Sequence, residues 1–220
     1  MWTGMQQSLS PDCFVRGANG RVNWVTRGAV AVVLSLLLLI GASASSFAVP
    51  QAGVRSHVKV YLMRGFMNVF SMGMDQMANE LEQHGIPADA YNHLLWGTLA
   101  SEAVADYKSG RTKTIILVGH SMGGDAVVNM VEALGNAGVP VALAVTLDIS
   151  SETITAGRVN NFVNLYISTG ALKAGPGFHG RMTNIDISKR LSVDHMTIEK
   201  NLVVQKMVVN YINQAIGSGQ

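Results

Sequence analysis

Short apolar runs alternate with longer amphipathic stretches from about residue 54 onward. The runs have the length and β-branched character of buried strands, and they cover Val58–Met63, Ala90–Leu95, Ile115–Val118, Val139–Leu147, Asn161–Ile167 and Met182–Ile187. Stretches with a helical apolar period cover Met72–His84, Leu99–Tyr107, Asp125–Leu134 and Glu199–Ile216. This alternation predicts an α/β fold, with a mostly parallel central sheet of about six strands flanked by helices and no insertion long enough for a cap domain.

The most specific stretch lies between residues 114 and 129. Ile115–Val118 is followed by Gly119-His120-Ser121-Met122-Gly123, which fits G-x-S-x-G, and a helical period begins at Asp125. Strand, tight glycine-flanked turn and helix form the context of a nucleophile elbow, which holds a serine hydroxyl at the carboxyl end of a sheet. The stretch therefore predicts Ser121 as a nucleophile, with an ordinary glycine-rich turn as the alternative.

A serine needs a base, because an unactivated hydroxyl is a poor nucleophile. The chain contains six histidines, and only His179 and His195 follow the nucleophile in the order Ser, Asp, His. His195 lies after the last predicted strand, where a loop can bring an imidazole over the sheet edge. His179 lies in Gly170–Gly180, which is expected to be a flexible connection. His195 is therefore the preferred base.

The acid that orients this base is predicted to be Asp148, because it directly follows the buried strand that comes after the elbow unit. Its carboxylate would accept the imidazole N–H and stabilise the imidazolium. Asp186 and Asp194 are competitors for this role. A turn cap formed with Ser150 or Ser151 is the alternative explanation of Asp148.

Backbone N–H groups are expected to stabilise the oxyanion. One is that of Met122 at the start of the elbow helix. The second is expected from the loop after the first strand, where the N–H of Phe66 is preferred and that of Gly65 is the alternative. Methionines crowd the same region, and they would either line an adaptable acyl pocket or belong to the core: Met63, Met67, Met72, Met74 and Met77.

The N-terminal part differs from the rest of the chain. Arg16, Arg21 and Arg27 precede the apolar run Ala29–Ile40, and a tract of small residues extends to Ala48. Residues 1–48 are therefore expected to be an export signal, and 49–220 the folded domain in a periplasmic or secreted location. The alternative is an uncleaved anchor in the inner membrane over residues 29–49. The only cysteine, Cys13, precedes the apolar run, so no disulfide is expected in the domain.

The charge of the chain argues against a nucleic-acid partner. Charged residues make up 14% of the sequence, and the formal net charge is only +2, without a basic stripe. No metal or cofactor site is expected. The expected partner is a small-molecule or lipid-like ester, with membrane association possible only through the N-terminal segment.

The chain resembles the α/β-hydrolase superfamily in three motifs. They are GHSMGG after ILV, LDIS after the next strand and VDHMTI near the end. More narrowly, they are similar to small exported bacterial hydrolases described as lipase-like or thioesterase-like. The resemblance covers about residues 58–216 and implies a serine esterase reaction by Ser121, Asp148 and His195, with Met122 as one oxyanion donor. Two departures stand out: many members place the acid one strand later, and no cap insertion is visible.

Together these observations predict an exported, cofactor-independent serine hydrolase of carboxylic esters or thioesters, acting through an acyl-enzyme. A short-to-medium acyl ester is the expected substrate. The alternative is a catalytically inactive protein of the same fold that is tethered at the membrane as a binding or scaffold module.

Overall fold

The computed structural model describes residues 57–66, 72–150, 154–168 and 170–218. The predicted export segment, residues 1–48, and its alternative as an anchor lie outside the described residues. The strands are β1 (Val58–Arg64), β2 (Ala88–Asn92), β3 (Thr114–His120), β4 (Val141–Leu147), β5 (Ile154–Tyr166) and β6 (Lys173–Asp186). The α-helices are α3 (Met72–Gln83), α4 (Trp96–Lys108), α5 (Met122–Asn136) and α6 (Leu202–Gly217), with 3-10 turns at His93–Leu95 and Ile198–Lys200.

The strands form one sheet in the order β2-β1-β3-β4-β5-β6, and every neighbouring pair is parallel. This confirms the predicted α/β fold with a parallel sheet of six strands flanked by helices. The chain moves from β1 outward to β2 and then returns to place β3 on the other side of β1. The order therefore reverses between β1 and β3, and open α/β sheets bind ligands at the carboxyl ends of strands at such a switch point.

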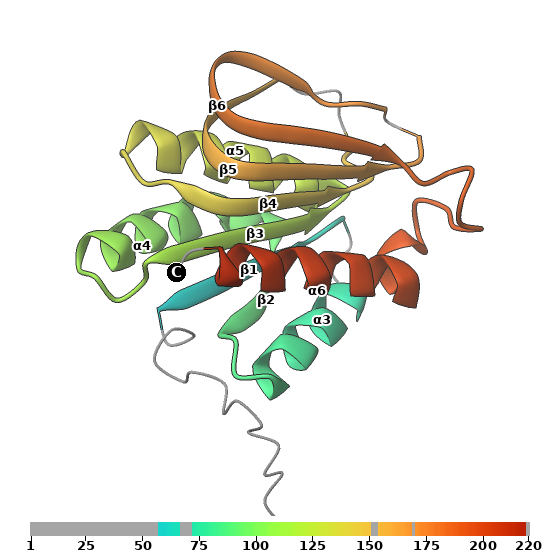
Figure 1. Ribbon diagram of the computed structural model, residues 1–220, viewed down its shortest axis with the longest axis horizontal. Coiled ribbons are helices and arrows are strands. Elements are labelled where there is room, and N and C mark those ends of the chain that lie inside the picture. The colour runs from blue at the N-terminus through green and yellow to red at the C-terminus, as the bar shows by residue number, and fades with distance from the viewer. Residues whose placement is uncertain (1–56, 67–71, 151–153, 169, 219–220) are drawn as a thin grey trace, which may run out of the picture. The chain divides into compact units, whose positions relative to one another are not determined.

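Helices cover both faces of the sheet (Figure 1). α3 and α6 pack on the face that carries Val60 and Leu62, whereas α4 and α5 pack on the face that carries Tyr61 and Met63. Successive side chains of a strand point to opposite faces, so a strand covered on both sides is apolar throughout. β1, β3 and β4 show this continuous burial, which is why their apolar runs were visible in the sequence.

β5 and β6 differ most from the expected boundaries. The predicted connection Gly170–Gly180 belongs largely to β6, so His179 lies in a strand and not in a flexible loop. Because β5 and β6 are parallel, the chain must return from the end of β5 to the start of β6. A straight strand of the 13 residues in β5 would be about 43 Å long, but the connection of residues 167–172 can span only about 25 Å. Both strands must therefore bend. Their pairing shifts register next to Gly157, and Figure 1 shows β6 turning through a broad arc.

The remaining boundaries shift by a few residues. α4 begins at Trp96, three residues before the predicted start, and β2 ends at Asn92, whose side chain accepts the N–H of Leu94 in the following 3-10 turn. α3 agrees with its prediction within one residue at the C-terminal end. Among the described residues, no helix has the length and apolar character that crossing a membrane requires.

Candidate active site

Ser121 lies in the turn between β3 and α5, in a backbone conformation that is strained for a residue with a side chain. Its φ is 54° and its ψ is −125°, outside the regions that non-glycine residues commonly occupy. The Ser121 N–H donates to the Leu147 carbonyl over 3.1 Å, and the Ser121 carbonyl accepts the N–H of Gly124 over 2.7 Å. These bonds hold the turn closed, so the Ser121 hydroxyl is fixed at the carboxyl edge of the sheet.

Glycine is required on both sides of this turn. A Cβ atom on Gly119 would lie 2.1 Å from the carbonyl oxygen of Gly123, and a Cβ atom on Gly123 would lie 2.1 Å from the carbonyl oxygen of Met63. Backbone cannot move away as a flexible side chain can, so neither position accepts a larger residue without a shift of the turn. The G-x-S-x-G pattern is thus explained by close backbone contacts among β1, β3 and α5.

The structure brings Ser121, His195 and Asp148 together. His195 Nε2 lies 2.8 Å from Ser121 Oγ, and His195 Nδ1 lies 2.7 Å from Asp148 Oδ2. A carboxylate only accepts, so Nδ1 carries the proton, and Nε2 is left to accept the hydroxyl proton of Ser121. Asp148 is fully buried, whereas the His195 side chain is 37% exposed. The arrangement can therefore move a proton from an oxygen nucleophile to an accessible imidazole.

Asp148 is held at the end of β4 by the loop that follows β5. Its Oδ1 accepts the N–H groups of Ile167 and Ser168, each over 2.9 Å, and its Oδ2 accepts the Ser168 hydroxyl over 2.8 Å. Burial acts to raise the pKa of Asp148, but these bonds and the His195 imidazole outweigh it and hold that pKa well below its usual value. The carboxylate therefore stays ionised beside His195.

Ser168 is a site residue that sequence reasoning missed. Its only signal was its place directly after the predicted strand Asn161–Ile167. The turn-cap explanation of Asp148 involved Ser150 or Ser151. The Ser150 hydroxyl bonds to Asp125, and Ser151 lies outside the described residues.

The competitors for the base and the acid are engaged elsewhere. Asp194 accepts the backbone N–H groups of Met196 and Thr197, each over 2.9 Å, and so shapes the loop of His195. Asp186 accepts the N–H and the hydroxyl of Ser188. His179 is exposed in β6, at the edge of the sheet opposite β2. Within the described residues, Ser121 therefore contacts the imidazole of His195, the predicted base, and not that of His179.

The loop after β1 lies against the nucleophile. A Cβ atom on Gly65 would be only 3.1 Å from Ser121 Cβ, so Gly65 and the following Phe66 are beside the elbow. Met122 begins α5, and the first N–H groups of a helix have no partner within the helix. The two elements from which oxyanion donors were predicted are thus adjacent to Ser121.

The methionines of this region differ in burial. Met63, Met74 and Met77 are fully buried in the two cores, whereas Met72 is 61% exposed. Met67 lies outside the described residues. Three of the five methionines are therefore core residues.

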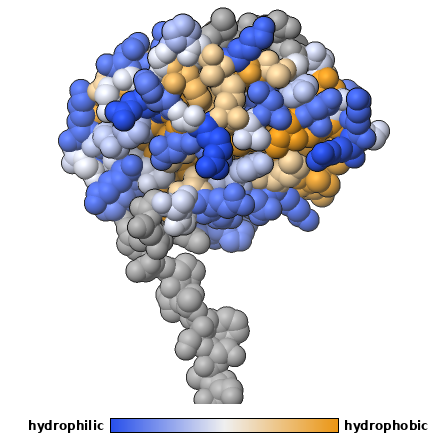
Figure 2. All heavy atoms as spheres, turned by 45° about the horizontal axis from the view of Figure 1, so that its top comes forward, coloured by the Kyte–Doolittle hydropathy of each residue, from blue (hydrophilic) through white to orange (hydrophobic). Residues whose placement is uncertain are grey.

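Exposed large apolar side chains gather at the carboxyl edge. We call this set the apolar rim, and it consists of Phe66, Met72, Leu94, Leu95, Met122, Met196, Leu202 and Val203. Each of these residues follows the end of a strand, flanks Ser121 or His195, or begins a helix that returns from this edge. Figure 2 shows hydrophobic surface on the right-hand side of the molecule, the side toward which the strands point in Figure 1.

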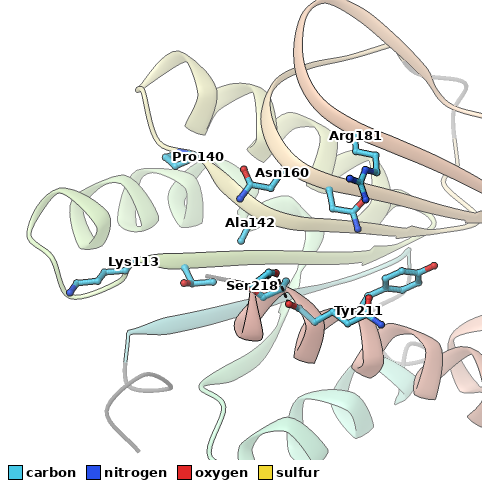
Figure 3. Close-up of a pocket in the computed structure, with 11 residues that line it drawn as sticks. Lys113, Pro140, Ala142, Asn160, Arg181, Tyr211 and Ser218 are labelled. Carbon is cyan, nitrogen blue, oxygen red and sulfur yellow. Dashed lines mark hydrogen bonds between the residues drawn. The ribbon is translucent and has the colours of Figure 1, made fainter. Parts of the chain in front are cut away.

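A separate groove of about 520 Å³ lies at the other edge of the sheet. It is lined by residues at the starts of β3 and β4, such as Thr114 and Ala142, and by the end of α6 near Ser218 (Figure 3). Arg181 and Tyr211 supply further polar groups. None of its lining residues is His, Asp or Glu, so it lacks the imidazole and carboxylate found at Ser121. Among the described residues, no three or more His, Cys, Asp or Glu side chains cluster as a metal site would require.

No family model matches the chain, and no curated protein matches it. Among solved structures, it is similar to a protein from Xanthomonas campestris pv. campestris that is described provisionally as a hydrolase of the alpha/beta superfamily. The two are 12% identical, with a TM-score of 0.39, over 69% of this chain and 98% of that chain.

Proposed function

We propose that the protein is a serine hydrolase of the α/β-hydrolase superfamily that cleaves carboxylic esters through an acyl-enzyme. One observation carries this proposal: the His195 imidazole bridges the Ser121 hydroxyl, at 2.8 Å, and the buried Asp148 carboxylate, at 2.7 Å. Nucleophile, base and orienting acid are thus in hydrogen-bond reach of one another, which is the arrangement that activates a serine.

In the first step, Ser121 Oγ attacks the ester carbonyl carbon while its proton passes to His195 Nε2. The ionised Asp148 stabilises the resulting imidazolium without taking the proton. The carbonyl oxygen becomes an oxyanion, and the N–H groups of Met122 and of Phe66 or Gly65 would donate to it. The tetrahedral intermediate then collapses, the alcohol leaves with the proton from His195, and the acyl group stays on Ser121.

In the second step, water replaces the alcohol. His195 Nε2 takes a proton from the water as it attacks the acyl carbon, and the second tetrahedral intermediate uses the same donors. Collapse breaks the bond to Ser121 Oγ, which recovers its proton from His195. The products are one alcohol and one carboxylic acid, and the protein returns to its starting state.

The apolar rim supports an ester with an apolar acyl group. Exposed Met122 and Met196 flank the nucleophile and the base in sequence, and the 67% exposed Phe66 belongs to the loop after β1, in which Gly65 lies against Ser121. Burial of an acyl chain against such side chains contributes about 0.8 kcal/mol per CH₂ group. We expect short-to-medium acyl esters to be the substrates, and oxygen esters to be preferred to thioesters of coenzyme A if the domain is exported.

Labelling with a fluorophosphonate tests the proposal directly. The purified full-length protein should be labelled, and Ser121→Ala should not, although it should melt at a similar temperature. Nitrophenyl esters of increasing chain length would then define the acyl preference. A folded wild type that neither reacts with the probe nor hydrolyses any of these esters would favour the inactive scaffold.

The export of the domain is a second part of the proposal, and it rests on the apolar run Ala29–Ile40 and the small residues that follow. Cell fractionation and sequencing of the mature N-terminus would separate its outcomes. A new N-terminus after Ala44 or Ala48 in the periplasm or the medium would support cleavage. An intact chain in the inner membrane would support the anchor, and an intact chain in the cytoplasm would contradict both.

A further inference from the structure

A second imidazole touches the loop that carries His195. His120 is the last residue of β3 and is 5% exposed. Its Nε2 lies 2.8 Å from the backbone carbonyl oxygen of His195, and the two rings are 5.0 Å apart between centroids. A carbonyl oxygen only accepts, so Nε2 carries a proton, and in the neutral imidazole Nδ1 is left as an acceptor. The residue before the nucleophile thus binds the backbone of the base.

A buried carboxyl group faces the other nitrogen of this ring. Glu199 lies four residues after His195, and its side chain is 1% exposed. Its Oε2 is 3.9 Å from His120 Nδ1, and within the described part of the chain neither atom has a hydrogen-bond partner. Buried polar atoms without partners are costly, and here two of them face each other behind the proposed catalytic histidine.

The rest of the Glu199 residue is fixed by α3 and α6. The N–H groups of Gly73 and Met74 donate to its carboxyl group, and the Gln205 side chain donates to its backbone carbonyl over 2.9 Å. A Cβ atom on Gly73 would lie 2.1 Å from that carbonyl oxygen. The C-terminal end of the loop that carries His195 is therefore held at Glu199 by α3 and α6, and His120 binds the backbone of this loop at His195 itself.

The protonation of Glu199 decides whether its Oε2 and His120 Nδ1 attract or repel each other. Burial raises the pKa of Glu199 to about 7 and lowers the pKa of His120 to about 4. Other charges act on the pair more weakly: Lys200 and Asp75 on Glu199, and His195, Asp148 and Lys200 on His120. Near pH 6 Glu199 is therefore protonated and can donate to Nδ1, directly after a closure of about 1 Å or through one water. At higher pH two acceptors face each other.

We propose that His120 and Glu199 are positioning residues, a buried pair that shares one proton and holds the His195 loop against the end of β3. The pair touches neither the substrate nor the reacting atoms, and the inference rests on the proposed function of Ser121, His195 and Asp148. Catalytic groups must be held within about 0.5 Å of their productive geometry. When the shared proton is lost, the loop loosens and the contact between His195 and Ser121 weakens.

Glu199→Gln provides the sharpest test. Its amide NH₂ can donate to Nδ1 at every pH, while its oxygen can still accept from Gly73 and Met74. We expect the ratio of kcat/KM at pH 8.5 to kcat/KM at pH 6, measured with a nitrophenyl ester, to be at least about threefold higher in Glu199→Gln than in wild type. Glu82→Gln, which changes an exposed residue of α3, is the matched control and should keep the wild-type ratio.

His120→Phe removes the bond to His195 and keeps a ring of similar size. We expect kcat to fall by about 10- to 100-fold with KM changed by less than about twofold, because a misplaced base affects the chemical step more than binding. If this variant does not fold, as judged by its melting temperature and near-ultraviolet circular dichroism, the pH profile of Glu199→Gln decides alone.

Three outcomes are distinguishable. A higher alkaline ratio in Glu199→Gln, with a lower kcat in a folded His120→Phe, supports the inference. Superimposable pH profiles of Glu199→Gln and wild type, in protein that is labelled at Ser121, overturn this inference and leave the proposed function intact. A folded wild type that is neither labelled nor active overturns both.

Discussion

The two edges of the sheet differ in backbone strain. At the carboxyl edge, Ser121 and Asp148 are the only non-glycine residues with positive φ in the described part of the chain, and both belong to the proposed triad. At the amino edge, the turns after α3, α4 and α5 place glycine in this conformation, at Gly85, Gly110 and Gly138, where it causes no strain. Strain that persists in a folded protein often marks a functional site.

The edges also differ in the side chains that they present. The amino edge has the groove of about 520 Å³ near Ser218, but it offers no imidazole or carboxylate. The carboxyl edge offers both, within hydrogen-bond distance of a hydroxyl. The carboxyl edge is favoured because parallel strands deliver loops and helix N-termini to it, at the point where the strand order reverses.

The largest expected effect is that of removing the nucleophile. Ser121→Ala should lower kcat/KM for nitrophenyl esters by about 10⁴-fold or more, because nothing else at the site can form the acyl-enzyme. Ser218→Ala at the amino edge is the matched control and should stay within about twofold of wild type. Equal losses in the two variants would mean that the edges do not differ in function.

Asp148→Asn should have the next largest effect. The amide cannot stabilise the imidazolium and favours the wrong tautomer of His195, so kcat should fall by about 10²- to 10⁴-fold. Asp186→Asn, which changes the acid at the end of β6, should retain most of the activity. Steady-state kinetics with one ester would compare them, and a greater loss in Asp186→Asn would transfer the orienting role to Asp186.

Gly123→Ala should destabilise the elbow, because its Cβ atom would lie 2.1 Å from the Met63 carbonyl oxygen. The free energy of unfolding should decrease by about 1–3 kcal/mol, as is typical of overpacking. Gly97→Ala in α4, where a Cβ atom meets nothing within 4 Å, should instead increase it by about 0.5–1 kcal/mol. Urea titration measures both, and a neutral Gly123→Ala would contradict the close packing of the turn.

A smaller effect is expected on the pH dependence of stability. The pKa of Asp148 is held below its ordinary value of 3.8 in the folded protein, so its ionised form stabilises the fold above about pH 4. That contribution is lost as the pH falls through the pKa of the folded state. The urea midpoint of wild type should therefore drop more between pH 6 and pH 3 than that of Asp148→Asn. An equal drop would show that the buried carboxylate is not stabilised.

The smallest effect is expected at the amino-edge groove. Arg181→Ala removes an exposed guanidinium and should change both kcat and KM by less than about twofold, since it lies away from Ser121. A rise of tenfold or more in KM would give the amino edge a part in substrate binding and remove the contrast between the edges.

The sequence alone determined the fold class, because β1, β3 and β4 are buried on both faces and α3 and α5 show a clear helical period. It also determined the elbow at Ser121, whose glycines and helix lie within a few residues of it. It did not predict β6 correctly, because Gly175, Pro176 and Gly177 suppress the local signal while pairing with β5 forms the strand. Strand pairing is non-local, so a window of sequence does not contain it.

Only the tertiary structure decided which distant groups meet. Asp148 and His195 were placed in the right order by sequence, but the contacts of His195 with Asp148 and with Ser121 close separations of 47 and 74 residues. The roles of Ser168, His120 and Glu199 had no comparable signal, since a serine after a strand or a single buried glutamate is not a motif. Local periodicity follows from which face of an element is buried, whereas these contacts follow from how the elements are arranged around the reversal between β1 and β3.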